Sequence, residues 1–292
     1  MLGTRELRRR IRTIENVERV TDAMQKISAA RLSREKARVL GARPYVEGVE
    51  RAVRNLATTD RPPNPLLRAN PSDNCMLIVV AADKGLCGSY NSNIIHAAEK
   101  FVAEHRHRQL HLITAGRKLR KFLPRTGGQV LRESISVPEP PFDAYTDELA
   151  GMVMTHYLME QIGYAYVLYT EFRTLGANRP VLKSILPVEP VARPLPMNYF
   201  YFYEPSASAV LERLLPEYVR LCIWEAFAEA TASEHAARMV MMEQASVNAR
   251  DMIDDLVLES NKLRQTGITR ELLDIVGTSE ALSKRALKGA AA

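Results

Sequence analysis

The residues that come nearest to a chemical motif form a glycine-rich loop, ADKGLCGSYN, at residues 82–91. The apolar run CMLIVV precedes this loop, and the helical pattern NIIHAAEKF follows it. Phosphate sites are often built in the order strand, glycine loop and helix, because free backbone N–H groups at a helix start attract anions. The first hypothesis to test is therefore a nucleotide-binding enzyme.

The glycine spacing does not support that hypothesis. A dinucleotide loop has three glycines spaced G-x-G-x-x-G, whereas this loop has only Gly85 and Gly88. A triphosphate loop has Gly-Lys-Ser/Thr at its end, whereas Lys84 precedes the first glycine here. We therefore expect the loop to need glycine for its backbone angles or for close approach of a partner, and we expect no nucleotide cofactor.

No other pattern predicts a catalytic or metal site. The histidines of EHRHRQLH have no cysteine neighbour and straddle a predicted helix-to-strand boundary, so they lack the regular spacing of metal ligands. The sequence contains no H-E-x-x-H and no G-x-S-x-G motif. Its three cysteines are an odd number without paired spacing, which indicates free thiols in a reducing compartment. We therefore predict a protein without catalytic residues, metal or cofactor.

The positive charge lies in one part of the chain. The 292 residues carry a formal net charge of +6, and residues 1–60 alone hold 14 Lys or Arg against 8 Asp or Glu. Apolar residues make up 46% of the chain, yet the longest apolar runs are far shorter than the ~20 residues of a membrane helix. The composition is that of a soluble globular protein. A basic N-terminal segment leaves two partner classes open, nucleic acid and an acidic protein surface.

Both ends of the chain have a helical period. Residues 4–40 contain no Gly or Pro, and their apolar residues recur every three or four positions; Gly41 and Pro44 are expected to bend or break the helix. Residues 217–266 also lack Gly and Pro, which predicts a second long helix after Pro216 that resumes beyond Gly267. The first helix would be about 80 Å long at ~1.5 Å per residue.

The residues between these helices have a different pattern. Short apolar runs, such as CMLIVV and LHLITA, alternate with helical stretches, which predicts an α/β domain with helices on both faces of its sheet. The expected fold class is α/β, with a helix at 1–58, a Rossmann-like domain at 70–205 and a helix at 206–292. We expect no place in the central domain for the apolar stripes of the helices. The simplest arrangement therefore pairs them as a long antiparallel coiled coil.

Three motifs together resemble one known family. They are the N-terminal RELRRRIRTIENVERVTDAMQKISAARL, the loop ADKGLCGSYN and the C-terminal NKLRQTGITRELLDIVG, in this order. The chain resembles, over nearly its whole length, the gamma subunit of F-type ATP synthases, which is the central stalk. It departs from the family pattern at Ala82, Ser89 and Ser260, so the resemblance is to a divergent member.

The resemblance implies a rotor without chemistry of its own. In the family, the coiled coil stands inside a hexamer of alternating alpha and beta subunits, and the α/β domain lies against epsilon and the membrane c-ring. The ATP sites are on the alpha and beta subunits, so no cofactor and no nucleic acid is expected on this chain. It would be peripheral to the cytoplasmic face of the bacterial inner membrane. The alternatives are the rotor of a second, sodium-translocating ATPase and a coiled-coil nucleic-acid-binding protein.

The resemblance also assigns residues to partner contact, and no residue to catalysis. In the loop, Lys84 and Cys87 would face the beta subunits, with Gly85 and Gly88 permitting close passage. In the C-terminal motif, Arg264 and Gln265 would make polar contacts that form and break as the rotor turns. Met24 and Lys26, in the N-terminal motif, complete the expected set of contacts with the beta subunits.

Overall fold

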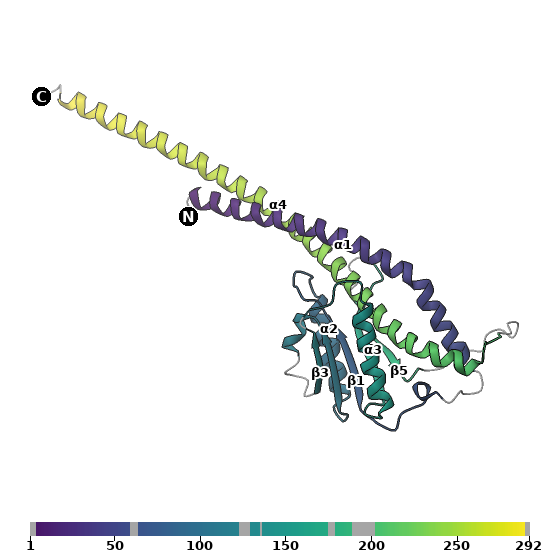
Figure 1. Ribbon diagram of the computed structural model, residues 1–292. Helices are drawn as coiled ribbons and strands as arrows, with labels where there is room; N and C mark the ends of the chain where they lie inside the picture. Colours follow the sequence, from purple (N-terminus) through teal and green to yellow (C-terminus); the bar gives the residue numbers. More distant parts are fainter. Residues whose placement is uncertain are drawn as a thin grey trace. The chain divides into compact units, whose positions relative to one another are not determined.

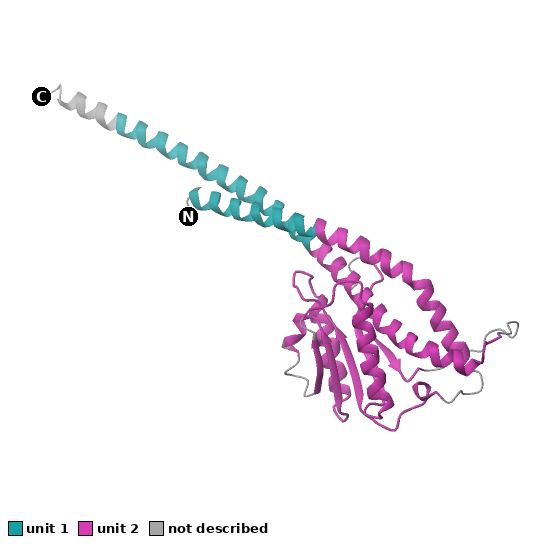
Figure 2. Ribbon diagram, in the orientation of Figure 1, with its two compact units in different colours: residues 1–25, 242–292 teal, residues 26–241 magenta. Residues whose placement is uncertain are grey.

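The computed structural model describes residues 4–58, 64–122, 129–134, 136–174, 179–188 and 202–289. The chain falls into two compact units (Figure 2): residues 1–25 with residues 242–292, which we call unit 1, and residues 26–241, which we call unit 2. The helices α1 (Thr4–Thr58) and α4 (Ala207–Gly289) each contribute to both units.

Unit 2 contains a five-stranded mixed sheet (Figure 1). Its strands are β1 (Cys75–Val80), β2 (Leu110–Ala115), β3 (Gln129–Ser134), β4 (Tyr164–Glu171) and β5 (Arg179–Leu186). They are ordered β3-β2-β1-β4-β5, and only β5 runs antiparallel to its neighbour. Every residue of β1 and β2 is buried, as the continuous apolar runs predicted.

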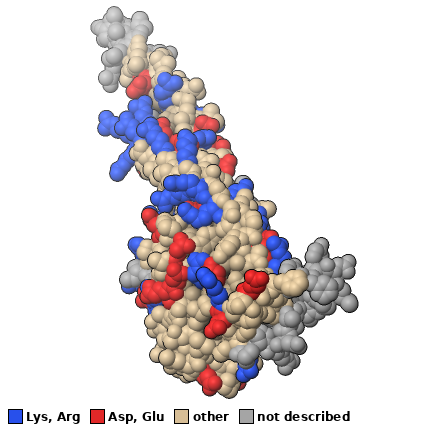
Figure 3. Space-filling model, turned by 45° about the vertical axis from the view of Figure 1, so that its right-hand side comes forward, with Lys and Arg blue, Asp and Glu red and all other residues tan. Residues whose placement is uncertain are grey.

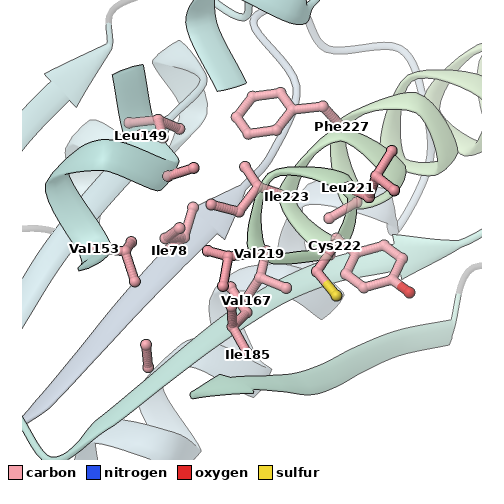
Figure 4. Packing of buried hydrophobic residues seen from close by; sticks show 14 of the residues in the cluster. Ile78, Leu149, Val153, Val167, Ile185, Val219, Leu221, Cys222, Ile223 and Phe227 are labelled. Carbon is pink, nitrogen blue, oxygen red and sulfur yellow. The ribbon is translucent and has the colours of Figure 1, made fainter. Parts of the chain in front are cut away.

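Helices cover both faces of this sheet. The helix α2 (Tyr90–Glu104) packs Ile94, Ala98 and Phe101 on one face. On the other face, α3 (Asp143–Leu158) and the first part of α4 bury their apolar side chains against β1, β4 and β5. Figure 4 shows the side chains of this second core, where Leu149 and Val153 of α3 and Val219, Ile223 and Phe227 of α4 gather over the strands. Two short 3-10 helices, Pro65–Leu67 (η1) and Arg117–Lys121 (η2), complete the domain.

Within unit 2, α1 packs against α4. Its buried residues, Val39, Val46, Val49 and Val53, belong to the same core as the first part of α4. The Tyr45 hydroxyl also donates a hydrogen bond of 3.1 Å to the Glu217 carboxylate of α4. Each fully buried valine contributes about 1.5–3 kcal/mol relative to an exposed one, so burial outweighs this single exposed hydrogen bond.

The helix α1, which was expected to bend or break at Gly41 and Pro44, continues without a break and curves within unit 2 (Figure 1). Two other expectations about the helices were wrong. The helix α4 begins at Ala207, with Pro216 inside it. The sheet also offers α4 a place for its apolar stripe, because Leu211 and Leu215 are fully buried in the core of unit 2. Burial on the sheet offsets the backbone hydrogen bond that Pro216 cannot make.

In unit 1, the N-terminal part of α1 lies beside α4. The Arg250 guanidinium of α4 is 2.9 Å from the Glu18 carboxylate of α1. Leu7 of α1 and Ala249 of α4 are buried. A hollow of about 530 Å³ lies between the two helices, with Ile14 among its lining residues. The Arg250–Glu18 ion pair and these buried side chains hold the two helices side by side in this unit.

The predicted fold class, an α/β domain inserted between two long helices that pair with each other, is confirmed. Within the described ranges, no helix combines the length and the apolar character that crossing a membrane requires.

Candidate partner-binding sites on the glycine loop and the long helices

The loop between β1 and α2 is held in place by its own polar side chains. The Asp83 carboxylate accepts hydrogen bonds from the Arg117 backbone N–H at 3.1 Å, from the Ser136 hydroxyl at 2.8 Å and from the Val137 backbone N–H at 3.1 Å. The amide oxygen of Asn91 accepts from the Ala82 backbone N–H at 3.0 Å. The loop therefore has a fixed conformation that is set by contacts within unit 2.

The crevice that a ligand would use in a doubly wound fold is occupied by α4. In such folds, ligands bind beyond the carboxyl ends of the strands where the strand order reverses, which here is between β1 and β4. At this position the Ser233 hydroxyl of α4 donates a 3.0 Å hydrogen bond to the Thr170 carbonyl of β4. The Tyr90 hydroxyl donates a 3.0 Å bond to the Ala230 carbonyl of α4. These contacts close the place where a nucleotide would lie.

The two loop glycines have different environments. Gly88 has a φ of +57°, and a β-carbon added there would lie 2.8 Å from the sulfur of Met241 in α4. Gly85 has no such constraint, because its added β-carbon would meet nothing closer than 3.8 Å. The close approach that Gly88 permits is thus to a helix of the same chain.

The loop exposes a cation and buries a thiol. The side chain of Lys84 is exposed, and no carboxylate among the described residues is within ion-pair distance of it. Leu86 is 60% exposed with a φ of 62°. Cys87, in contrast, is buried beside Tyr90 and Ala237, and this burial raises the pKa of its thiol. The structure therefore gives Cys87 a packing role and leaves Lys84 available to a partner.

The remaining predicted contact residues lie on the long helices. Lys26 is exposed on the part of α1 that belongs to unit 2. In unit 1, Met24 is half-buried on α1, while Arg264 and Gln265 are exposed on α4. Within the described part of the chain, neither the Arg264 nor the Gln265 side chain makes a hydrogen bond or ion pair.

The C-terminal part of α4 also exposes apolar side chains. Ile268, Leu272, Ile275 and Val276 are between 49% and 63% exposed. They recur at three- and four-residue spacing, so they form one stripe along the helix, which we call the α4 stripe. An exposed apolar stripe of this size is typical of a binding surface.

Comparison with known proteins identifies the family. The family model described as ATP synthase matches residues 3–282. The chain is 37% identical to the ATP synthase gamma chain of Pelotomaculum thermopropionicum over 284 residues, which cover 97% of this chain and 100% of that relative. It is 35% identical to the ATP synthase gamma chain of Desulforudis audaxviator over 296 residues, with the same coverage. The chain belongs to the ATP synthase gamma chain family.

Solved structures share the fold of this gamma chain family member. One is a chain of the Euglena gracilis mitochondrial ATP synthase, in a structure of OSCP, F1 and c-ring, with a TM-score of 0.63 and 17% identity over 96% of this chain and 94% of that one. Another is in the central stalk and c-ring structure of the Tetrahymena thermophila mitochondrial ATP synthase. It has a TM-score of 0.55 and 19% identity, over 78% of this chain and 99% of that one. The nucleic-acid-binding alternative is not favoured.

Sequence reasoning missed part of the surroundings of the gamma chain loop. The Arg238 guanidinium of α4 donates a 3.3 Å hydrogen bond to the Gly85 carbonyl and a 2.6 Å bond to the Glu234 carboxylate. His235, which follows Glu234, is buried, and its Nδ1 has no hydrogen-bond partner. These residues are about 150 positions from the loop, so no local pattern links them to it. The only signal was the presence of charged and polar residues on an otherwise apolar helix face.

A substitution at Gly88 tests whether the loop is built into unit 2. We expect Gly88→Ala to lower the free energy of unfolding by about 1–2 kcal/mol, because a left-handed backbone is unfavourable for alanine and its methyl group would press on Met241. The measurement is urea unfolding of the full chain. The matched control is Gly85→Ala, which should stay within about 0.5 kcal/mol of the unmodified chain. Equal losses of unfolding free energy in the two variants would contradict the packing of Gly88 against α4.

Proposed function

We propose that this chain is the central rotor of an F-type ATP synthase, which couples rotation of the membrane c-ring to conformational changes in the catalytic beta subunits. The observation that carries the proposal is the full-length match to gamma chains, together with a fold in which two long helices flank an α/β domain in the sequence and pair with each other. Its fold neighbours come from structures of a central stalk with its c-ring, of OSCP with F1 and the c-ring, and of a rotor, which supports assembly with such partners.

Each segment of the chain has its own proposed partners. The helical segments 1–58 and 206–292 would stand within the hexamer of alpha and beta subunits, and the α/β segment 70–205 would bind epsilon and the c-ring. ATP chemistry would take place on the alpha and beta subunits. This assignment agrees with the position of α4, which occupies the crevice in which this fold would hold a nucleotide. The chain would lie at the cytoplasmic face of the bacterial inner membrane, held there through the complex.

A mixed-charge surface suits a rotor. On the face shown in Figure 3, Lys and Arg side chains gather along the long helices, and Asp and Glu side chains lie among and beside them. Such a surface can form and break charged contacts with acidic partner loops at successive angles without holding one angle tightly. We assign charged contacts with the beta subunits to Lys84, Lys26 and Arg264, and further contacts with them to Met24 and Gln265. Cys87 is left out of the set because it is buried.

The proposal is tested by removing two of these side chains. We expect the double variant Arg264→Ala/Gln265→Ala to lower ATP turnover of the assembled complex about tenfold, since both side chains are exposed and make polar contacts only with a partner. Assembly should be retained, because neither residue supports the fold of unit 1. The measurements are ATP hydrolysis and size-exclusion chromatography of the complex.

The matched control for this variant is Lys262→Ala. Lys262 is also an exposed cation of α4, but it projects from a different side of the helix, two residues from Arg264. ATP turnover of the complex with Lys262→Ala should stay within about twofold of that of the unmodified complex, because a solvated charge contributes little to partner contacts. Unchanged turnover in the double variant, or an equal loss in the control, would contradict the assigned role.

A further inference from the structure

A groove in unit 2 collects positive charge around the glycine loop. It has a volume of about 540 Å³ and is formed by α1, the β1–α2 loop, η2, the segment before α3, and α4. Its cations are Arg31, Arg34, Arg38, Lys84, Arg117 and Arg238, and its carboxylates are Glu35, Asp83, Glu139 and Glu234. The groove therefore carries two more positive than negative charges.

Most of the carboxylates are already engaged. Glu35 pairs with Arg38, and Glu234 pairs with the buried Arg238 at 2.6 Å. Asp83 is saturated by the hydrogen bonds that fix the loop. Glu35 and Glu234 are thus each matched by a cation of their own, and Asp83 is held by the loop instead of by a cation of the groove.

The other cations of the groove lack a carboxylate partner. Among the described residues, no carboxylate lies within ion-pair distance of the side chains of Arg31, Arg34, Lys84 or Arg117. They come from three different elements of the fold. Cations from separate elements that outnumber the carboxylates of one groove favour an anion between them.

A buried polar atom points to the same ligand. His235 lines the groove, is only 8% exposed, and has an Nδ1 atom without a hydrogen-bond partner. A buried ring nitrogen without a hydrogen-bond partner lowers the stability of the fold, and a ligand in the groove can supply that hydrogen bond. Burial and the nearby guanidinium groups of Arg238, Arg31 and Arg34 lower the pKa of His235 to about 4. Its ring is therefore neutral at pH 7, and a negative charge beside it would raise that pKa.

We propose that this groove binds a doubly charged phosphate group, either inorganic phosphate or the phosphate monoester of a small molecule. The surplus of two positive charges matches a phosphate dianion, and guanidinium groups bind phosphate oxygens in pairs. The volume exceeds that of phosphate and lies in the range of small-molecule sites, so it leaves room for an ester group. The site is formed by side chains, unlike a backbone phosphate loop. It rests on unit 2 alone, and it shares only Lys84 with the proposed contacts with the beta subunits.

The test is a calorimetric titration of the full chain at pH 7.5 in a low-chloride buffer. The ligands are inorganic phosphate, glycerol 3-phosphate and a hexaglutamate peptide, each at the same ionic strength. We expect saturable binding of at least one phosphate compound. Tighter binding of the ester would assign the ligand as a phosphorylated small molecule, and equal binding would assign free phosphate. Binding of the peptide alone would overturn the proposal in favour of an acidic protein segment.

Matched variants locate the binding. Arg31→Gln/Arg34→Gln removes two exposed cations of the groove, and we expect it to weaken phosphate binding about tenfold or more. Lys36→Gln removes an exposed cation of the same helix that does not line the groove, and it should change binding by less than about twofold. Equal weakening in the two variants would show unspecific attraction and would overturn the proposal.

The protonation of His235 gives a second readout in the unmodified chain. In NMR titrations of histidine-labelled protein, phosphate should raise the pKa of His235 and leave the other histidines unmoved, with His235→Gln used to assign the signal. A His235 signal that titrates identically with and without saturating phosphate would overturn the site. The absence of a heat signal with both phosphate compounds in the calorimetric titration would also overturn the site.

Discussion

Replacing Phe227 with alanine is expected to lower the free energy of unfolding of the chain by about 3–5 kcal/mol. Phe227 lies on α4, is fully buried, and has its ring centroid 5.4 Å from that of Tyr145 and 6.1 Å from that of Phe142. Truncation to alanine would leave a cavity at the point where α4 meets α3 and the sheet (Figure 4). The measurement is urea unfolding of the full chain, with the midpoint and slope fitted separately.

The matched control for this core variant is Phe202→Ala. Phe202 is 94% exposed, so its loss should change the free energy of unfolding by less than about 0.5 kcal/mol. A loss below about 1 kcal/mol at Phe227 would contradict the packing described here. It would also weaken the functional account, because torque can pass between the α/β domain and α4 only if the two are held as one body.

The second large effect is expected at the α4 stripe. Leu272→Asp should weaken assembly of the chain into the ATP synthase complex by about 10- to 100-fold, since it loses apolar burial and places a charge in the interface. Leu272 is 57% exposed in the isolated chain, so the unfolding free energy of the chain alone should be almost unchanged. The measurements are complex yield from purified subunits and urea unfolding of the free chain.

Glu271→Gln is the control for this stripe variant. It changes the adjacent exposed residue without touching the apolar side chains, and its assembly should match that of the unmodified chain. Normal assembly of Leu272→Asp would show that the α4 stripe is not a binding surface. A large loss of stability in the free chain would instead place Leu272 in the fold of unit 1, contrary to its exposure.

Local patterns were sufficient to predict the elements of the fold. The buried strands β1 and β2 appeared as continuous apolar runs, and the helical periods at both ends predicted α1 and most of α4. The predictions failed where tertiary contacts override local preference. Pro216 is a helix breaker by its chemistry, but burial of Leu211 and Leu215 on the sheet keeps α4 helical on both sides of it.

The candidate sites were predictable only in part. The spacing of Gly85 and Gly88 argued against a nucleotide loop, but only the fold revealed that α4 fills the crevice beside it. The hydrogen bond from Ser233 to the Thr170 carbonyl joins residues 63 positions apart, and a single sequence carries no pattern for such a contact. The same holds for the groove, where Arg34 of α1 and His235 of α4 lie about 200 positions apart along the chain.

The central claim is that this chain rotates while ATP is hydrolysed elsewhere in the complex. The most direct measurement is single-molecule rotation of the reconstituted complex, with the catalytic subunits fixed to a surface and a bead attached to the Arg106→Cys variant. Arg106 is exposed in unit 2, whereas Cys75, Cys87 and Cys222 are buried, so the new thiol should be labelled selectively. The account predicts continuous rotation in one direction when ATP is added, and no rotation without it. ATP hydrolysis at a normal rate with motionless beads would contradict it.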